Sequence, residues 1–382
     1  MKTLPAILLG LMACVAIGVS TARAQVMYTL EDLGVVEKME ASQSAAINNN
    51  GDVAGTASKG EETCAFHYDY LKKFMYDAGG FNSRGFGINS TNVVVGDAFF
   101  AGPMEPRSHA AIFSGGVAKD IGVLPGQVYS RANSINKRGE VVGFSGLQRD
   151  GTESRAFMWS YQTGLIDIGT LGGPYAQAYA INQRGSITGA SQTQGMGPMV
   201  TTHAFIYQVP ETPYRRYSRM VDLGVLGGLS SYGTAINNYN HVAGYSTVTN
   251  DATNDERVHA FFHDGTKMID LGSLGGIDNR WGSDMSVALG INNYDQVVGY
   301  TYLQAVGEMP LQQVAFLWRR GLNGGGQMIN LNKLLYGIGK NYLVVSATAI
   351  NDNGQIAGAA YDIRDGSVHA VVLTPTGPYL TR

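Results

Sequence analysis

Four histidines are the residues whose type best suits metal binding or proton transfer, and all four occupy one position of a recurring segment. They are His109, His203, His259 and His369, each directly before Ala. A metal needs ligands that converge on one point, whereas equivalent positions of a repeat are spread around the molecule. His259 and His263 lie four residues apart, which on a strand is roughly 13 Å. The pattern therefore predicts a structural hydrogen bond at each His, and we expect no metal and no cofactor.

Carboxylates could serve a glycosidase, in which two acidic side chains converge at the substrate as acid and base or nucleophile. The candidates are loop residues: Asp150, Glu153, Asp278 and Asp284. Nothing in their spacing requires them to converge.

The acidic segment 250–256 could hold Ca²⁺, but it lacks the Gly-punctuated spacing of a calcium loop and is expected to be solvated. Gly143 to Gly146 includes a Ser but not the full nucleophile-elbow pattern. A secreted hydrolase or lyase using loop carboxylates remains an alternative.

These residues must be positioned by a repeated hairpin, which is clearest at Ala180 to Gly189. The apolar Ile181 ends one strand, Asn182 can cap the turn through its own backbone, and Gly185 tolerates a positive φ. The same frame recurs at Ile47, Ile88, Ile135, Ile236, Ile291 and Ile350, with Asn after each Ile and Gly eight residues after it. Seven copies in one register indicate a repeat architecture.

Two further segments recur between the hairpins. One is a strand that ends in Asp-Leu-Gly or Asp-Ile-Gly, as at Asp32, Asp120, Asp167, Asp222 and Asp270; the other begins with His-Ala-Phe or a close variant. Each repeat therefore contains four short strands. The repeated Ile positions are between 41 residues (Ile47 to Ile88) and 59 residues (Ile291 to Ile350) apart. Four strands in this span are typical of a propeller blade.

The order of these segments predicts how the ring closes. The first hairpin follows an Asp-Leu-Gly strand, whereas the last repeat stops after its third strand, at His369 to Val371. The N-terminal strand would then complete the last blade and remove an open sheet edge. We therefore expect an all-β fold: a single seven-bladed β-propeller of four-stranded antiparallel blades over residues 25–382.

The combination of Ile-Asn-Asn-x-Gly hairpins, His-Ala-Phe strands and Asp-Leu-Gly-Thr-Leu-Gly-Gly loops, as at Asp167 to Gly173, resembles the HAF repeat family of extracellular bacterial repeat proteins. The resemblance covers residues 26–374, with departures in repeats one, two and seven. It implies secretion and a repeat fold, and it implies no activity.

The N-terminus has the pattern of a signal peptide over residues 1–24. Lys2 precedes a short apolar run, and Ala22-Arg23-Ala24 is an A-x-A cleavage site. A lipid-anchor reading at Cys14 competes, but the apolar run before it is short. We therefore expect a protein exported to the periplasm or the medium.

Composition limits the classes of partner. Removing residues 1–24 takes two of the 27 basic residues and leaves 25 against 30 acidic ones, a net charge of −5. Such a charge does not favour nucleic acid or acidic lipid.

No later apolar stretch approaches the ~20 residues that span a bilayer. Cys64 would then be alone, so packing must supply stability. We expect a monomer.

The variable loops between the second and third strands of each repeat are where a ligand is expected, because function concentrates on loops over a rigid scaffold. The inner strands carry small residues at alternate positions and no Asp or Glu at positions one and three to five before each Ile. Polar and aromatic residues near these loops form the candidate ligand-binding set: Arg84, Tyr129, Arg131, Tyr175, Tyr232, Arg280 and Trp281. Tyr, Trp and Arg suit recognition of a carbohydrate or a protein. The sequence thus favours an exported, non-catalytic binding propeller; a purely structural surface protein is a further alternative.

Overall fold

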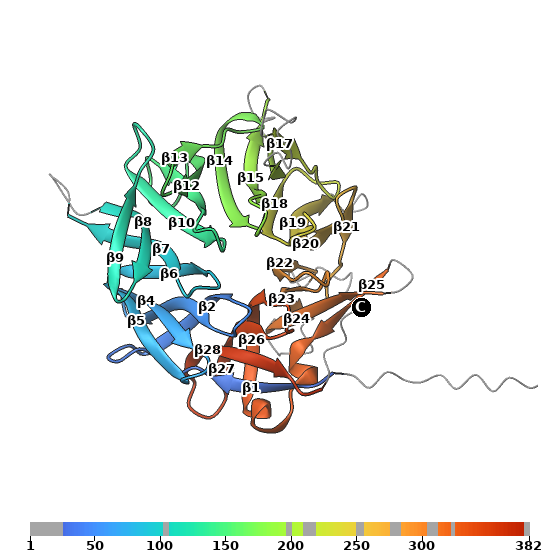
Figure 1. Cartoon of the computed structure of the whole chain (residues 1–382). Helices are drawn as coiled ribbons and strands as arrows, with labels where there is room; N and C mark the ends of the chain where they lie inside the picture. The colour runs from blue at the N-terminus through green and yellow to red at the C-terminus, as the bar shows by residue number, and fades with distance from the viewer. Residues whose placement is uncertain are drawn as a thin grey trace, which may run out of the picture.

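Seven four-stranded antiparallel sheets stand as blades around a central axis in the computed structural model (Figure 1). The structure describes residues 26–101, 107–195, 201–208, 219–249, 256–275, 284–303, 312–321 and 325–377. The expected signal peptide at 1–24 lies outside these residues. The prediction of an all-β, seven-bladed β-propeller is confirmed. Within the described part of the chain, no helix is long and apolar enough to cross a membrane.

The repeated Ile ends the strand nearest the axis in every blade, and the Gly that follows lies in the second strand. The inner strands are β2 (Ala41–Ile47), β6 (Ser83–Ile88), β10 (Tyr129–Ile135), β14 (Gly172–Ile181), β18 (Ser231–Ile236), β22 (Ser286–Ile291) and β26 (Tyr342–Ile350). The second strands are β3 (Val53–Lys59), β7 (Val94–Phe100), β11 (Val141–Gly146), β15 (Ile187–Thr193), β19 (Val242–Thr249), β23 (Val297–Leu303) and β27 (Ile356–Asp362).

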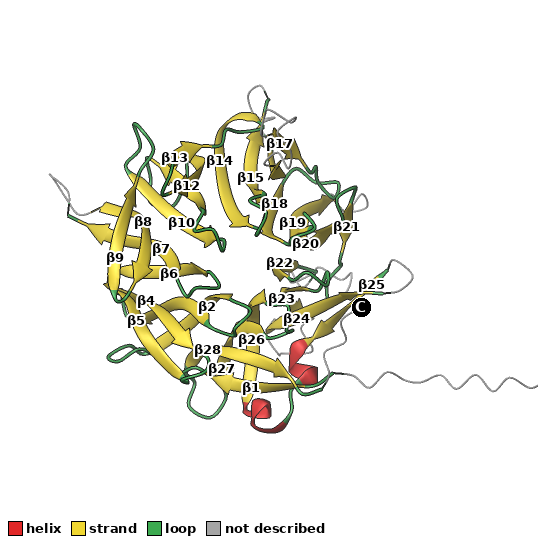
Figure 2. Ribbon diagram, in the orientation of Figure 1, coloured by secondary structure: helices red, strands yellow, loops and turns green. Residues whose placement is uncertain are grey.

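The His-Ala-Phe segments form the third strands and the Asp-Leu-Gly segments end the outer ones. The third strands are β4 (Glu62–Asp69), β8 (Arg107–Ser114), β12 (Ser154–Ser160), β16 (Thr202–Gln208), β20 (Glu256–His263), β24 (Gln312–Arg320) and β28 (Val368–Pro375). The outer strands are β5 (Phe74–Phe81), β9 (Val117–Gly122), β13 (Gly164–Asp167), β17 (Arg219–Asp222), β21 (Met268–Asp270), β25 (Gly326–Asn330) and β1 (Tyr28–Asp32). Two 3₁₀ segments, η2 (Leu331–Leu334) and η3 (Gly337–Asn341), connect β25 to β26 (Figure 2).

The N-terminal strand closes the ring as the order of segments predicted. Strand β1 pairs with β28 in the sheet β1-β28-β27-β26, with Tyr28 opposite Pro375 and Asp32 opposite Val371. In Figure 1 the first strand lies beside the last. This pairing covers the edge of β28 that would otherwise be exposed.

Each inner strand contains a β-bulge two residues before its Ile. One extra residue stands there without a partner in β3, β7 or the equivalent strand: Ala45, Phe86, Asn133, Tyr179, Thr234, Leu289 and Thr348. A bulge bends its strand and re-aims the side chain of the extra residue. The side chains at these seven positions are all partly exposed.

The bulge explains the repeated Gly of the second strand. A Cβ added to Gly143 would lie 1.8 Å from the backbone oxygen of Arg131, and one added to Gly189 would lie 1.9 Å from that of Gln177. The Phe of the third strand lies over the same Gly, as Phe157 does over Gly143. The repeated Gly and Phe therefore form one packing unit, which has no room for another side chain.

Small residues of the inner strand link neighbouring blades. Five serines accept a hydrogen bond from the backbone N–H of the Ala in the preceding blade's third strand, at 2.8 to 2.9 Å: Ser42, Ser83, Ser130, Ser231 and Ser286. Each also donates to a Gly carbonyl at or just after the end of the outer strand of that blade. The apolar core likewise lies between blades, where Val142 and Ala156 of one blade cluster with Ala178 and Ile187 of the next.

The turns that follow the inner strands lie together on one face, which we call the turn face. In each of them an Asn Oδ1 accepts the backbone N–H groups two and four residues later; at Asn237 the donors are Tyr239 and His241, both at 3.0 Å. This is the cap expected from the sequence. The opposite face, which we call the loop face, contains the connections between second and third strands and between blades.

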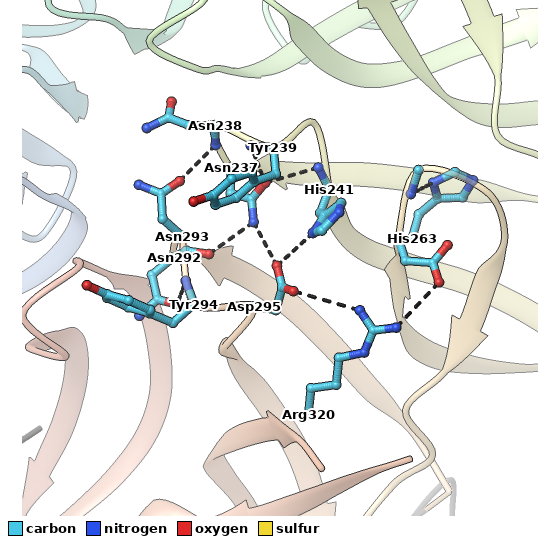
Figure 3. Close-up of polar contacts among 12 residues, drawn as sticks. Asn237, Asn238, Tyr239, His241, His263, Asn292, Asn293, Tyr294, Asp295 and Arg320 are labelled. Atoms are coloured by element: carbon cyan, nitrogen blue, oxygen red, sulfur yellow. Dashed lines mark hydrogen bonds and ion pairs between the residues drawn. The ribbon is translucent and has the colours of Figure 1, made fainter. Parts of the chain in front are cut away.

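The same seven asparagines form a closed ring of hydrogen bonds. Each Nδ2 donates to the backbone oxygen of the Asn in the next blade, at 2.9 to 3.4 Å, in the order Asn48, Asn89, Asn136, Asn182, Asn237, Asn292, Asn351 and back to Asn48. We call this the asparagine ring. Figure 3 shows one link, from Asn237 to Asn292, beside a buried Asp295 that also binds His241. The ring fixes the position of each blade relative to its neighbours.

Candidate functional site

A pocket of about 430 Å³ lies on the loop face between blades three, four and five. We call it the tyrosine pocket. Its lining comprises Asp150, Gly151, Thr152, Glu153, Ser154, Tyr175, Ala176, Gln177, Tyr179, Ala190, Ser191, Gln192, Thr202 and Tyr232. Its volume falls within the range of small-molecule sites. Tyr175 and Tyr232, which the sequence placed in the candidate set, are brought together here.

Gln177 of β14 holds the loop that forms one wall of the tyrosine pocket. Its Nε2 donates to the Gly151 carbonyl at 2.7 Å and to Ser154 Oγ at 3.1 Å, while its Oε1 accepts the Tyr179 hydroxyl at 2.8 Å. Gly151 has φ 85° and Glu153 has φ 56°, a conformation that residues with a side chain rarely adopt. The loop is therefore held in one conformation before any ligand arrives.

Tyr179 is a pocket residue that sequence reasoning missed. It is the extra residue of the β14 bulge, so its side chain does not follow the alternation of the strand. Position two before the repeated Ile varies in size from Ala45 to Tyr179. That variation within a uniform repeat is the signal that could have found it.

One polar atom in the tyrosine pocket is buried without a protein partner. Gln192 Oε1 accepts no hydrogen bond from the described residues, although Gln192 lines the pocket. A buried acceptor without a donor costs about 1–3 kcal/mol. A ligand hydroxyl or amide that donates to Gln192 would remove this cost.

Tyr232 presents a fixed aromatic ring to the tyrosine pocket. It stacks on Tyr245 with ring centroids 4.8 Å apart and an interplanar angle of 17°. Burial, followed by the neighbouring Tyr232 and Tyr300, raises the pKa of Tyr245 to about 12, so its hydroxyl is neutral at physiological pH. The pair offers a rigid surface for a ligand with an apolar face.

Arg84 and Arg131, both in the candidate set, meet at a single carboxylate. Arg84 Nε donates to Asp97 Oδ1 at 2.9 Å and its Nη2 binds Asp97 Oδ2. Arg131 Nε lies 3.8 Å from Asp97 Oδ2 and makes no hydrogen bond. The structure brings these two together where blades two and three meet, although neither lines the tyrosine pocket.

The other members of the candidate set do not join these groups. Tyr129 begins β10 and its backbone oxygen accepts Ser145 Oγ at 3.0 Å, but its side chain is absent from the pocket lining. Arg280 and Trp281 lie outside the described residues. So does the loop acid Asp278, together with most of the segment 250–256.

Asp150, which lines the tyrosine pocket, has little of the character of a general acid. Asp150 accepts Thr152 N–H at 2.9 Å and Thr152 O–H at 2.7 Å, and these bonds lower the pKa of its carboxyl. A glycosidase acid needs a raised pKa. Asp284 lies in another blade, where Ser273 Oγ at 2.7 Å, His259 at 3.1 Å and Arg257 bind it. Although burial opposes ionisation, these partners lower the pKa of Asp284.

The repeated histidines make structural hydrogen bonds, as the sequence predicted. Each His Nδ1 binds the Asp that ends an outer strand of the same blade: His109 to Asp120, His203 to Asp222, His259 to Asp270 and His369 to Asp32, at 2.9 to 3.0 Å. Arg155 takes the same place opposite Asp167. Across the described ranges, no group of three His, Cys, Asp or Glu side chains is placed to hold a metal ion.

A family model described as a protein of unknown function (DUF3466) matches residues 279–369, which is less than half of the chain. This match corrects the resemblance to the HAF repeat family, which is wrong as a family assignment. The motifs that carried the resemblance have packing roles here: Asn forms the asparagine ring, His binds the outer-strand Asp, and Phe covers the Gly opposite the bulge. No curated protein matches the chain.

Among solved structures the chain is similar to the β-propeller domain of the Trilobed protease from Pyrococcus furiosus, described as having an open velcro topology. The two share 12% identity, with a TM-score of 0.51 over 90% of this chain and 100% of that domain. At this identity the likeness supports the propeller fold alone.

Proposed function

We propose that this protein is a non-catalytic binding propeller that recognises a saccharide in the tyrosine pocket. The observation that carries the proposal is the buried Gln192 Oε1, which has no donor among the described residues, in a pocket with three tyrosines. Sugars offer hydroxyl donors for such an acceptor and apolar C–H faces for aromatic rings. A protein partner would not need a pocket of this size.

The absence of catalysis is part of the proposal. The lowered pKa of Asp150 makes it a poor proton donor at neutral pH, which supports binding over hydrolysis. Release of reducing ends from a bound glycan, measured over hours, would instead support the hydrolase alternative.

Glycan-array screening of the full chain, followed by titration calorimetry, tests the saccharide proposal. Tyr232→Ala should weaken binding about 10-fold or more, because a stacked aromatic contact contributes about 1.5 kcal/mol or more. Tyr239→Ala is the matched control, since Tyr239 is 57% exposed on the turn face. If no glycan binds, or if Tyr232→Ala binds as the wild type does, the proposal fails.

We also propose that the protein is exported and that residues 1–24 are removed. The basic start, the short apolar run and the A-x-A site support this. N-terminal sequencing of the protein recovered from the periplasm and the medium should begin at Gln25. Recovery of a chain that begins at Met1 would contradict export through this signal.

A further inference from the structure

Three arginines gather at the loop-face ends of blades two and three, beside the tyrosine pocket. Arg84 and Arg131 come from β6 and β10, and Arg149 comes from the loop after β11. Aromatic rings support all three guanidinium groups. Phe86 lies 5.6 Å from Arg84 and 4.8 Å from Arg131, and Phe99 lies 4.7 Å from Arg149. We call this group the arginine cluster.

One carboxylate serves the arginine cluster, and Arg84 already occupies it. Asp97 is 3% exposed and binds both Nε and Nη2 of Arg84, while Ser108 Oγ donates to it at 3.0 Å. Arg131, at 3.8 Å, is too far to hydrogen bond. Among the described residues, no carboxylate forms an ion pair with Arg149. The cluster therefore holds more positive than negative charge.

Arg131 is positioned to contact a ligand. Its side chain is 23% exposed, and it lies between the rings of Phe86 and Phe144, 4.8 and 5.3 Å from their centroids. Burial lowers the pKa of Arg131; Asp97 opposes this shift, and the charges of Arg84 and Arg149 add to it. An incoming anion would relieve this repulsion.

Tyr179 connects the tyrosine pocket to the arginine cluster, although the three arginines do not themselves line the pocket. Tyr179 lines the pocket and interacts electrostatically with both Arg131 and Tyr232. The Phe144 ring packs against Gly151 of the pocket wall and also lies against the guanidinium group of Arg131. A saccharide that stacks on Tyr232 can therefore extend a charged substituent toward Arg131.

We propose that the ligand is an acidic saccharide whose carboxylate binds Arg131 and Arg149, while Arg84 and Asp97 hold the cluster in place. This inference rests on the proposed saccharide function and names its substrate class. The planar guanidinium matches the two oxygens of a carboxylate, as in a uronic acid. Asp150 and Glu153 line the tyrosine pocket, so the carboxylate that the cluster binds must lie at the Arg131 side.

Calorimetric titration of the full chain with three saccharides tests this proposal. The probes are oligogalacturonate, the matched neutral galacto-oligosaccharide and a sulfated galacto-oligosaccharide of equal length. We expect oligogalacturonate to bind at least about 10-fold more tightly than the neutral form, as for a charge-assisted hydrogen bond. Its affinity should fall as NaCl rises, whereas the neutral form should be insensitive to salt.

Substitutions then assign the effect to the arginine cluster. Arg131→Met keeps the packing between two rings and should lower oligogalacturonate affinity about 10-fold to 100-fold, a larger loss than for the neutral form. Arg131→Lys should restore part of the loss. The matched control is Arg138→Gln, an exposed Arg of the turn face that pairs with Glu140. If Arg131→Met does not fold, the exposed Arg149→Gln carries the test with a smaller expected loss.

The outcomes separate this inference from the proposed function. Equal binding of the acidic and neutral forms, or normal oligogalacturonate binding by both Arg variants, overturns the acidic-saccharide proposal and leaves saccharide binding in place. Tighter binding of the sulfated form than of oligogalacturonate also overturns the acidic-saccharide proposal. Such a result would show that the site recognises negative charge and not a carboxylate. Binding of none of the three, with no hit on the glycan array, would overturn the proposed function itself.

Discussion

The turn face and the loop face are built on the same inner strands, yet they satisfy their polar groups in opposite ways. On the turn face, every repeated Asn is buried and uses both side-chain atoms within the asparagine ring. On the loop face, Gln192 Oε1 and Arg131 Nε are buried and have no hydrogen-bond partner among the described residues. The bonded asparagines stabilise the fold, whereas the unpaired atoms of Gln192 and Arg131 could be satisfied by a ligand.

The largest effect on stability should come from breaking the asparagine ring. Asn237→Ala removes two backbone caps and the side-chain bonds to Asn292 and Asp295, both of which are drawn in Figure 3. We expect a loss of about 2–4 kcal/mol in the free energy of unfolding, because two buried and two partly buried hydrogen bonds are lost. Urea denaturation followed by circular dichroism measures it.

Asn238→Ala is the control for this substitution. Its side chain accepts one bond, from the Gln183 N–H at 3.0 Å, so we expect a loss below about 1 kcal/mol. Equal losses of unfolding free energy for the two variants would show that the asparagine ring makes no special contribution to stability.

A smaller loss is expected for the serine bridges that support the loop face. Ser231→Ala leaves the Ala204 N–H without its acceptor in a fully buried place. The expected cost is about 1–2 kcal/mol, as for an unsatisfied buried donor. Thermal unfolding compared with Ser90→Ala, an exposed Ser on the turn face, measures it. A variant as stable as wild type would show that water or a backbone shift replaces the bridge.

The hydrogen bonds of His259 with Asp270 and Asp284 should make a pH-dependent contribution to the free energy of unfolding. Its expected size is about 1 kcal/mol, that of one net hydrogen bond. Burial opposes the charged ring, but Asp270 and Asp284 outweigh it and raise the pKa of His259 above its usual value of about 6.5. A raised folded-state pKa means that the stabilisation is complete below about pH 6.5 and is lost as pH rises through the folded-state value.

Unfolding free energies of wild type and His259→Gln between pH 5.5 and 9 check this sign. The difference between the two proteins should be largest at acid pH and should shrink as the pH rises. A difference that grows with pH would show that neutral His259 is the stabilising form.

The smallest effect on stability, with the opposite sign, is expected in the tyrosine pocket. Gln192→Met keeps the shape of the side chain and removes the unpaired oxygen, so stability should be unchanged or higher by up to about 1 kcal/mol. Saccharide binding should fall at the same time. Differential scanning calorimetry with and without ligand measures both. A clear loss of stability would mean that Gln192 serves the fold and not a ligand.

Much of the fold could be predicted because it depends on residues that recur in every repeat. The Ile-Asn turn, the Gly eight residues later and the unpaired last repeat indicate hairpins, blades and ring closure without reference to any distant residue. The predicted bond of each repeated His was also correct in kind, although its partner, the outer-strand Asp, was not identified.

The candidate site was predicted only in part, because its members depend on partners from other blades. Tyr175 and Tyr232 were identified as aromatic residues near variable loops, but Tyr179 and Gln192 were not. Tyr179 enters the pocket through a bulge, which breaks the alternation on which strand predictions rely. Tyr129 fitted the same sequence criteria, yet it does not line the pocket.

The sequence by itself determined the blade, the number of blades and the strand that closes the ring, since these follow from periodic local patterns. Only the tertiary structure decided which polar groups are satisfied. Arg84 and Arg131 occupy the same position of successive repeats, yet only Arg84 faces an acidic partner across its strand pair, Asp97, whereas Arg131 faces Phe144. The charge of Arg131 also depends on Asp97 of the neighbouring blade, whose Oδ2 lies 3.8 Å from Arg131 Nε, and local sequence patterns do not encode that distance.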